Sequence, residues 1–176
     1  MENLKPEAFE GVTALKARVL AMKEQASIYN DQYDDLVSEQ EQLRQLSDNG
    51  SYLSDEEQTR MQQIERMMEA HTIFVKTLNE LRTIQEALGK TEEEIRINLA
   101  HENAHANQAS TLGVSHNGYR VIILRDGEIY QTNITFPDTM DPHTATSAYR
   151  QILYAPETYG HGGGLSDDDK QDLNKP

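Results

Sequence analysis

The sequence predicts an α+β protein, in which a long antiparallel helical hairpin (a coiled coil) precedes a small domain that combines a helix with a β-hairpin. Three observations lead to this fold class. Apolar residues follow a heptad spacing through the first half of the chain. Two histidines lie four residues apart on a third helical segment. Two β-branched segments flank an Asp-Gly pair. We therefore expect a hairpin at 1–90, an α+β domain at 91–155 and a flexible acidic tail at 156–176.

Composition limits the classes of partner. The chain has 176 residues and a formal net charge of −14, so we expect neither a nucleic-acid nor a membrane partner, since both attract basic surfaces. It contains no cysteine, and any zinc would need imidazole, carboxylate or water ligands. There is no apolar segment of about 18 residues and no signal peptide. We expect a cytoplasmic protein, with export by a non-classical route as the alternative.

The first arm of the predicted hairpin has apolar residues at alternating steps of three and four, which is the seam of a coiled coil. The seam residues are Val12, Leu15, Val19, Met22, Ala26, Tyr29, Tyr33, Leu36, Gln40 and Leu43. The pattern stops at residues 47–51, where Asn49-Gly50 favours a reversal of the chain.

The second arm opens with Ser54 three residues before Glu57, which is a capping box. Its seam residues are Met61, Ile64, Met68, His71, Val75, Leu78 and Leu88. Two helices of about 40 and 34 residues follow from this spacing. We expect the two arms to pair with each other, with a helix of another chain as the alternative partner. We interpret His71 as a seam residue and not as a metal ligand.

A third helix is expected from the capping box of Thr91 and Glu94 to Gly113, and it carries the segment His101-Glu102-Asn103-Ala104-His105. Residues four apart share one face of a helix, so both imidazoles can point at one cation, with the intervening carboxylate near a water on that cation. The alternative is an exposed helix whose polar side chains face solvent.

Residues 119–124 and 129–136 are predicted strands, because both are rich in β-branched and aromatic residues and Asp126-Gly127 favours a tight turn between them. A two-stranded hairpin is marginal alone, so we expect it to cover the third helix. A short helix at 145–154, capped by Thr144, would complete the same core.

The pattern His-Glu-x-x-His-Ala-x-x-Ala-x-x-x-Gly, from His101 to Gly113, resembles the zincin metallopeptidases, and most of all the small metallopeptidase domains of bacterial toxin and phage-associated proteins. The resemblance covers residues 95–137. It implies that His101 and His105 are zinc ligands and that Glu102 is the general base. The extended metzincin motif is absent, and the predicted strands follow the helix whereas zincins normally place their sheet before it.

The third protein ligand is left open by this resemblance. Downstream candidates are His116, Glu128, Asp138 and His143. We rank His116 first, because it lies in the loop directly after the helix and a short reversal would bring it back to the metal. Glu128 ranks second, because it has the sequence distance of a glutamate-type zincin ligand. By the same resemblance, Tyr119 or Tyr130 would offer a phenol to a developing oxyanion.

Two functions follow from these patterns. In the first, the chain is a zinc-dependent peptidase that acts on a peptide or protein substrate through a metal-activated water, and the coiled-coil arm docks a partner. In the alternative, the chain is a non-enzymatic coiled-coil assembly or adaptor protein of phage or secretion-system type, with a coincidental or degenerate motif. Its coiled coil would then bind a protein partner or a second copy of the chain.

Overall fold

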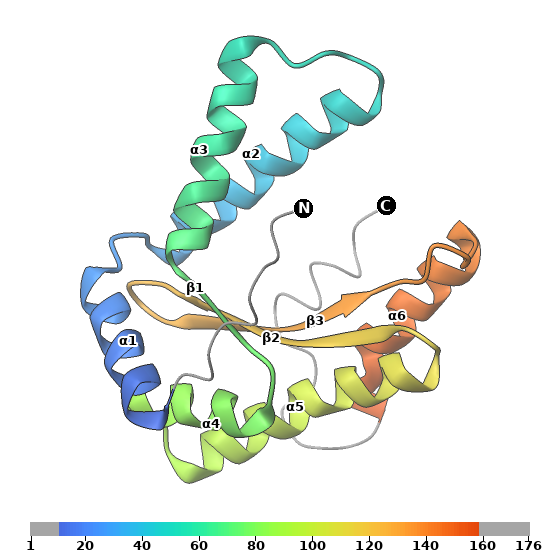
Figure 1. Cartoon of the computed structure of the whole chain (residues 1–176). Helices are drawn as coiled ribbons and strands as arrows, with labels where there is room; N and C mark the ends of the chain where they lie inside the picture. Colours follow the sequence, from blue (N-terminus) through green and yellow to red (C-terminus); the bar gives the residue numbers. More distant parts are fainter. Residues whose placement is uncertain (1–10, 159–176) are drawn as a thin grey trace. The chain divides into compact units, whose positions relative to one another are not determined.

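The computed structural model describes residues 11–158, which form six helices and one three-stranded antiparallel sheet (Figure 1). The elements in chain order are α1 (Val12–Gln25), α2 (Asn30–Asp48), α3 (Asp55–Ala70), β1 (Thr72–Val75), α4 (Leu78–Ala87), α5 (Glu92–Thr111), β2 (Ser115–Ile123), β3 (Glu128–Thr135) and α6 (Pro142–Thr158). The predicted α+β class is confirmed. No helix among these residues is long and apolar enough to cross a membrane.

The predicted long coiled-coil hairpin is not present, and its first arm is divided at residues 26–29. There the carbonyl oxygen of Ile28 accepts a hydrogen bond from the backbone N–H of Arg125 at 2.8 Å. A continuous helix would need that carbonyl for the N–H of residue 32. The Arg125 guanidinium also lies over the Tyr29 ring, 4.4 Å from its centroid. Heptad spacing alone did not reveal this competing contact.

The second arm also ends early, because α3 stops at Ala70 and the chain then forms β1. The segment Thr72–Val75 consists of β-branched and aromatic residues, which favour a strand over a helix. His71 is the C-cap of α3, and its carbonyl oxygen accepts a hydrogen bond from the N–H of Ile123 at 2.7 Å. His71, Val75 and Leu78 therefore do not share one helical seam.

The sheet has the order β1-β2-β3. The predicted hairpin is confirmed as β2 and β3, and Leu124 donates to the Gly127 carbonyl oxygen at 2.9 Å across the turn. Beside β1, Gly118 has a φ of +98°, and a Cβ at this position would lie 2.3 Å from the carbonyl oxygen of Val75. Glycine is required there by both the backbone conformation and the close approach.

The chain folds into two compact units that do not follow its order. The first combines α4, α5 and α6 with residues 11–20 and with parts of each strand, and the second contains residues 21–73 and 121–129. In the second unit, α2 and α3 run antiparallel (Figure 1) and share an apolar core. Its buried members are Ile28, Tyr33, Leu36, Leu43, Ile64, Ile122 and Leu124.

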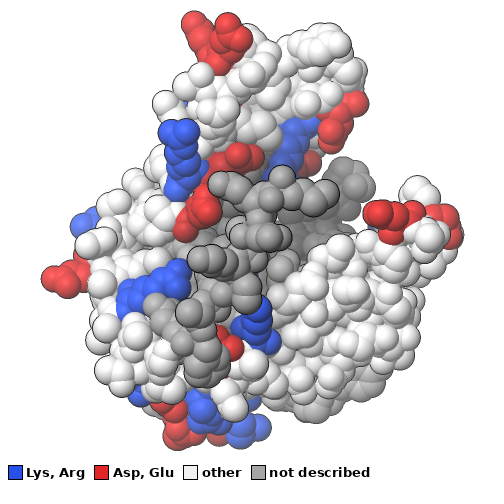
Figure 2. All heavy atoms as spheres, viewed as in Figure 1, with Lys and Arg blue, Asp and Glu red and all other residues white. Residues whose placement is uncertain are grey.

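In the first unit, α5 packs against both α4 and α6. The predicted third helix is confirmed as α5, and the predicted helix at 145–154 is the middle of the longer α6. Residues 156–158 of the predicted tail belong to α6, and the remainder of that tail lies outside the described residues. Figure 2 shows Lys and Arg side chains next to Asp and Glu side chains on the described residues of the face drawn.

Candidate metal centre

Helix α5 begins at a capping box in which both hydrogen bonds are made. Thr91 accepts from the Glu94 N–H at 3.2 Å, and Glu94 Oε2 accepts from the Thr91 N–H at 2.7 Å. Gly113, with a φ of +73°, ends the helix. These two signals set where α5 begins and ends, and α4 and α6 pack against it. The buried residues are Ile95, Glu102, Ala104, His105, Ala106 and Ala109.

The two histidines of the motif meet on this face. His101 Nε2 and His105 Nε2 lie 3.1 Å apart, and the rings meet edge to face with their centroids 4.8 Å apart. His105 Nδ1 lies 2.7 Å from the carbonyl oxygen of Ile152 on α6. A carbonyl oxygen only accepts, so His105 carries its proton at Nδ1 and presents the Nε2 lone pair toward His101.

This arrangement fits a zinc ion. Ligand nitrogens about 2.0–2.1 Å from a tetrahedral ion are separated by about 3.3–3.4 Å, and the observed 3.1 Å needs only a small opening. One ligand atom each from His101, Glu102 and His105 forms a group within 4.8 Å. The bond from His105 to the Ile152 carbonyl is the kind of outer contact that orients a metal-binding imidazole.

Glu102 is a buried carboxylate, only 4% exposed, and β3 supplies a partner for it. Thr132 Oγ1 donates to Glu102 Oε2 at 2.7 Å and also lies 3.1 Å from the Glu102 backbone oxygen. A hydrogen bond to a charged acceptor is stronger than one between neutral groups. Thr132 therefore holds the carboxylate next to the imidazoles, and the sequence reasoning did not identify this residue.

Tyr119 on β2 lies within electrostatic range of this carboxylate. Burial raises the pKa of the Tyr119 phenol, and the negative charge of Glu102 raises it further. The Tyr119 ring also meets the His116 ring edge to face at 4.8 Å. Within the described residues, the buried His116 Nε2 has no hydrogen-bond partner. Tyr119 therefore contacts His116 and lies within electrostatic range of Glu102.

None of the predicted third ligands joins the His101, Glu102 and His105 group. His116 lies on β2 in the same compact unit as that group, whereas Glu128 belongs to the other unit. Asp138 lies in the exposed connection between β3 and α6, and His143 is exposed near the start of α6. Tyr130, the other predicted oxyanion donor, lies on β3.

A cavity of about 250 Å³ adjoins the group. Glu102 and His105 form part of its wall, β2 contributes Arg120, and the remaining lining comes from β3 and α6. The side chains from those two elements are Tyr130, Gln131, Thr132, Asn133, Ile134, Tyr149, Ile152 and Leu153. The residues of this wall lie far apart in the sequence, so only the fold brings them together.

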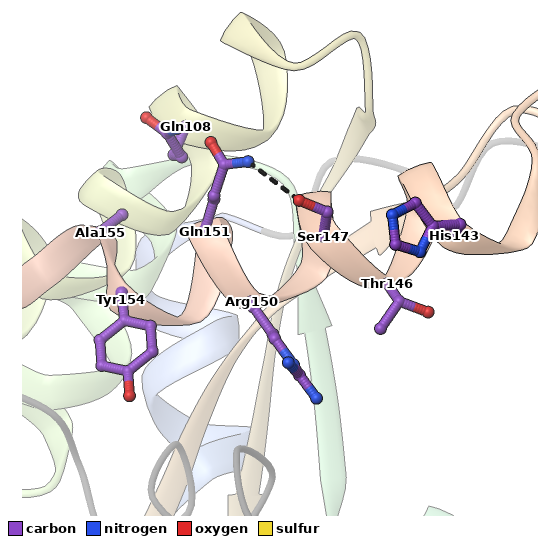
Figure 3. Close-up of a pocket in the computed structure, with 8 residues that line it drawn as sticks. All are labelled: Gln108, His143, Thr146, Ser147, Arg150, Gln151, Tyr154 and Ala155. Carbon is purple, nitrogen blue, oxygen red and sulfur yellow. Dashed lines mark hydrogen bonds between the residues drawn. The ribbon is translucent and has the colours of Figure 1, made fainter. Parts of the chain in front are cut away.

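A larger cavity of about 730 Å³ lies along α6, with Gln108 as its lining residue from α5 (Figure 3). Gln151 Nε2 donates to Ser147 Oγ across one turn of α6 at 3.4 Å. Arg150 and Gln151 point away from each other around the helix. Neither Glu102 nor either motif histidine lines this cavity, so we assign the candidate site to the smaller one.

The smaller cavity is thus lined by the His105 imidazole and the buried Glu102 carboxylate, and His101 Nε2 lies 3.1 Å from His105 Nε2. Such a group is suited to holding a divalent cation and to moving a proton beside it. Comparisons of the chain with protein-family models, with curated proteins and with solved structures found no match.

Proposed function

We propose that this chain is a zinc-dependent peptidase in which His101 and His105 hold the ion and Glu102 is the general base. The observation that carries the proposal is the 3.1 Å approach of the two Nε2 atoms beside the buried Glu102 carboxylate. A bound zinc ion supplies Lewis-acid chemistry, because it polarises a carbonyl and lowers the pKa of a coordinated water. Peptide hydrolysis is the reaction that the resemblance to zincins implies.

The residues of the chain have separate roles in this proposal. His105 keeps its proton at Nδ1, where the Ile152 carbonyl holds it, so that Nε2 acts as a ligand. Glu102 takes a proton from the attacking water at a carboxylate oxygen and passes it to the leaving amine. Thr132 keeps that carboxylate in place. Tyr119, whose pKa the charge of Glu102 raises, is one candidate for the phenol that meets the developing oxyanion, and Tyr130, which lines the cavity, is the other.

Zinc content of the purified full-length chain is the primary test. We expect about one zinc ion per chain by elemental analysis, and a loss to background in His101→Ala and His105→Ala, because each variant removes one of the two imidazoles that the motif supplies. His143→Ala is the matched control, since His143 is exposed and outside the group. Background zinc in the unaltered chain would reject the proposal.

Catalysis is tested separately with Glu102→Gln. This variant should keep its zinc and lose roughly 10²-fold or more of the hydrolysis of a quenched fluorescent peptide mixture, because general acid–base catalysis contributes on that scale. Unchanged hydrolysis would mean that Glu102 is not the base. Loss of zinc together with activity would instead indicate that Glu102 is a ligand.

The third ligand remains a prediction, and His116 is favoured over Glu128 because it lies in the same unit and contacts Tyr119. If His116 completes the coordination when zinc binds, His116→Ala should weaken zinc affinity, measured by competition with a chromophoric chelator, by about 10-fold or more. Glu128→Ala should leave the affinity unchanged. The reverse result would assign the ligand to Glu128.

The adaptor function is the second candidate, and it is favoured by exposed apolar side chains in the α2–α3 pair. Tyr52, in the loop between these helices, is fully exposed, and Leu46 and Met67 are also exposed. Such residues are typical of a surface that binds protein. Three results together would support this function. The chain would contain no zinc, its mass in solution by light scattering would exceed that of a monomer, and that mass would fall in Tyr52→Ser.

A further inference from the structure

Arg120 and Gln131 form a cross-strand pair in the wall of the smaller cavity. Arg120 Nε donates to Gln131 Oε1 at 2.9 Å, and Arg120 Nη2 donates to the same oxygen. Arg120 is on β2 and Gln131 is on β3. The first strand therefore carries the guanidinium, and a side chain of the second strand orients it. Both side chains line the cavity that also contains Glu102 and His105.

Among residues 11–158, no carboxylate forms an ion pair with this guanidinium. Within the described residues, the hydrogen-bond partner of Arg120 is the neutral amide of Gln131, and Arg120 forms no ion pair. The arginines at 60, 82 and 96 are each paired with a glutamate, in a chain with 30 acidic and 16 basic residues. An arginine at a cavity wall with only a neutral partner keeps N–H donors available for an anion.

We infer that this cavity is a subsite for a carboxylate, which is held by the Arg120 guanidinium in the orientation that Gln131 sets. Arginine binds a carboxylate through two parallel hydrogen bonds, and this geometry suits a donor that is already oriented. The volume of about 250 Å³ lies below the range of about 300–1,000 Å³ typical of small-molecule pockets. The subsite therefore accepts one residue of a longer ligand.

The inference deepens the proposed function and rests on it for its catalytic meaning, because it names peptides with a carboxylate near the scissile bond as the substrate class. The carboxylate has two sources, an acidic side chain or a free carboxyl terminus. The larger cavity is a weaker candidate for the same chemistry, although Arg150 lines it. Arg150 is exposed, and no described side chain holds its guanidinium in the way that Gln131 holds Arg120 (Figure 3).

The test measures binding to the zinc-free, full-length chain, so that it does not depend on catalysis. Three short peptides with acetylated amino ends are titrated by two-dimensional NMR. One has an internal Glu and an amidated end, the second has only Gly residues and a free carboxyl end, and the third has Gln and an amidated end. We expect one or both carboxylate peptides to bind at least about ten-fold more tightly than the third, and the tighter of the two identifies the source.

Two variants of different kinds test the residue assignment. Arg120→Met should weaken binding of the carboxylate peptide at least about ten-fold. Gln131→Glu should weaken it to a similar degree while the chain stays folded, because a carboxylate of the chain itself then pairs with Arg120. Arg150→Met is the matched control and should bind like the unaltered chain.

Several results would overturn the inference. These are equal binding of all three peptides, no binding of either carboxylate peptide, a Gln131→Glu variant that binds normally, or loss of binding in Arg150→Met alone. Carboxylate binding in a chain that takes up no zinc would support the subsite and reject the peptidase. Zinc uptake without carboxylate binding would reject the subsite and leave the peptidase standing.

Discussion

Helices α3 and α5 begin in the same way and bury very different faces. Each starts at a complete capping box, and each has three acidic residues in its first turn. Yet α3 buries a single residue, Ile64, whereas α5 buries six, including Glu102 and His105. Local signals thus decide where a helix starts, and the elements that pack on it decide what its face holds.

The two faces are stabilised by different forces. Full burial of an isoleucine side chain contributes about 1.5–3 kcal/mol through the hydrophobic effect, whatever the apolar neighbours are. Burial of a carboxylate or an imidazole is unfavourable unless specific partners replace water. In α5 those partners are the Thr132 hydroxyl and the Ile152 carbonyl, which come from β3 and α6. The stability of the buried polar residues of α5 therefore depends on individual hydrogen-bonding atoms. The stability of the buried face of α3 depends on how much apolar volume is packed there.

The largest expected effect is on the apolar face. Ile64→Ala should lower the free energy of unfolding by about 2–5 kcal/mol, because Ile64 is 0% exposed and its loss leaves a cavity in the α2–α3 core. Denaturant unfolding followed by circular dichroism measures this change. Ile64→Val is the control, with an expected loss of about 0.5–1.5 kcal/mol. Equal losses in both variants would show that α3 is not tightly packed at this position.

A smaller effect is expected on the polar face. Thr132→Val should lower the free energy of unfolding by about 1.5–3 kcal/mol at neutral pH, because it removes a hydrogen-bond donor from the buried Glu102 carboxylate and keeps the side-chain shape. Thr132→Ser keeps the hydroxyl and should lose much less. The same unfolding experiment measures all three chains.

A double-mutant cycle separates this hydrogen bond from other effects of the substitution. When Glu102 is already Leu, Thr132→Val should be nearly neutral, because no carboxylate remains to be satisfied. The difference between the two backgrounds is the coupling energy of the pair. An equal loss in both backgrounds would show that Thr132 acts through packing and not through Glu102.

Loss of either capping box should lower the free energy of unfolding by the same amount, which is smaller than the effect of Thr132→Val. Ser54→Ala and Thr91→Ala should each lower the free energy of unfolding by about 1 kcal/mol, because both caps are exposed and make the same two hydrogen bonds. Ser54→Asp, which retains a capping oxygen, is the control and should be nearly neutral. A much larger loss at Thr91 would mean that the cap also positions the polar face of α5.

The same contrast shows how much of the fold the sequence predicts. Capping boxes, Gly113 and the Asp126-Gly127 turn act within a few residues, and the helix starts, the helix end and the hairpin turn that they predict are all present. The coiled coil was predicted from a longer pattern and is absent. Its spacing is real, but the backbone groups at Ile28 and His71 bond to the β2–β3 hairpin instead. A heptad pattern records apolar spacing and holds no information on such distant partners.

The candidate site divides in the same way. His101, Glu102 and His105 were identified from the sequence because they lie within one turn of a helix, and the structure brings them together. Thr132 and Arg120 were not identified, because each is ordinary in a strand and acquires its role from residues 30 and 11 positions away in the chain. His116 was expected in the loop after the helix, but it belongs to β2, and its role as a ligand stays a prediction.

The smallest expected effect is on the titration of Tyr119, and it probes the polar face of α5 without disturbing its packing. Burial raises the pKa of Tyr119 above its ordinary value of 10.0, and the charge of Glu102 adds to this. Glu102→Gln should therefore lower the Tyr119 pKa, but not to the ordinary value, because burial is the larger cause. NMR titration of the assigned Tyr119 ring carbon measures the shift, and Glu86→Gln, which removes an exposed charge, is the control.

The sign of the corresponding stability change follows from linkage. Above pH 10 the unfolded chain has lost the Tyr119 proton while the folded chain retains it, so the unfolded state binds fewer protons and stability falls as pH rises. In Glu102→Gln, the total fall in the free energy of unfolding through the Tyr119 titration should be smaller, because the Tyr119 pKa is raised less. An unchanged Tyr119 pKa in that variant would mean that Glu102 carries no charge near the phenol, and Tyr119 would then lose its assigned place beside the general base.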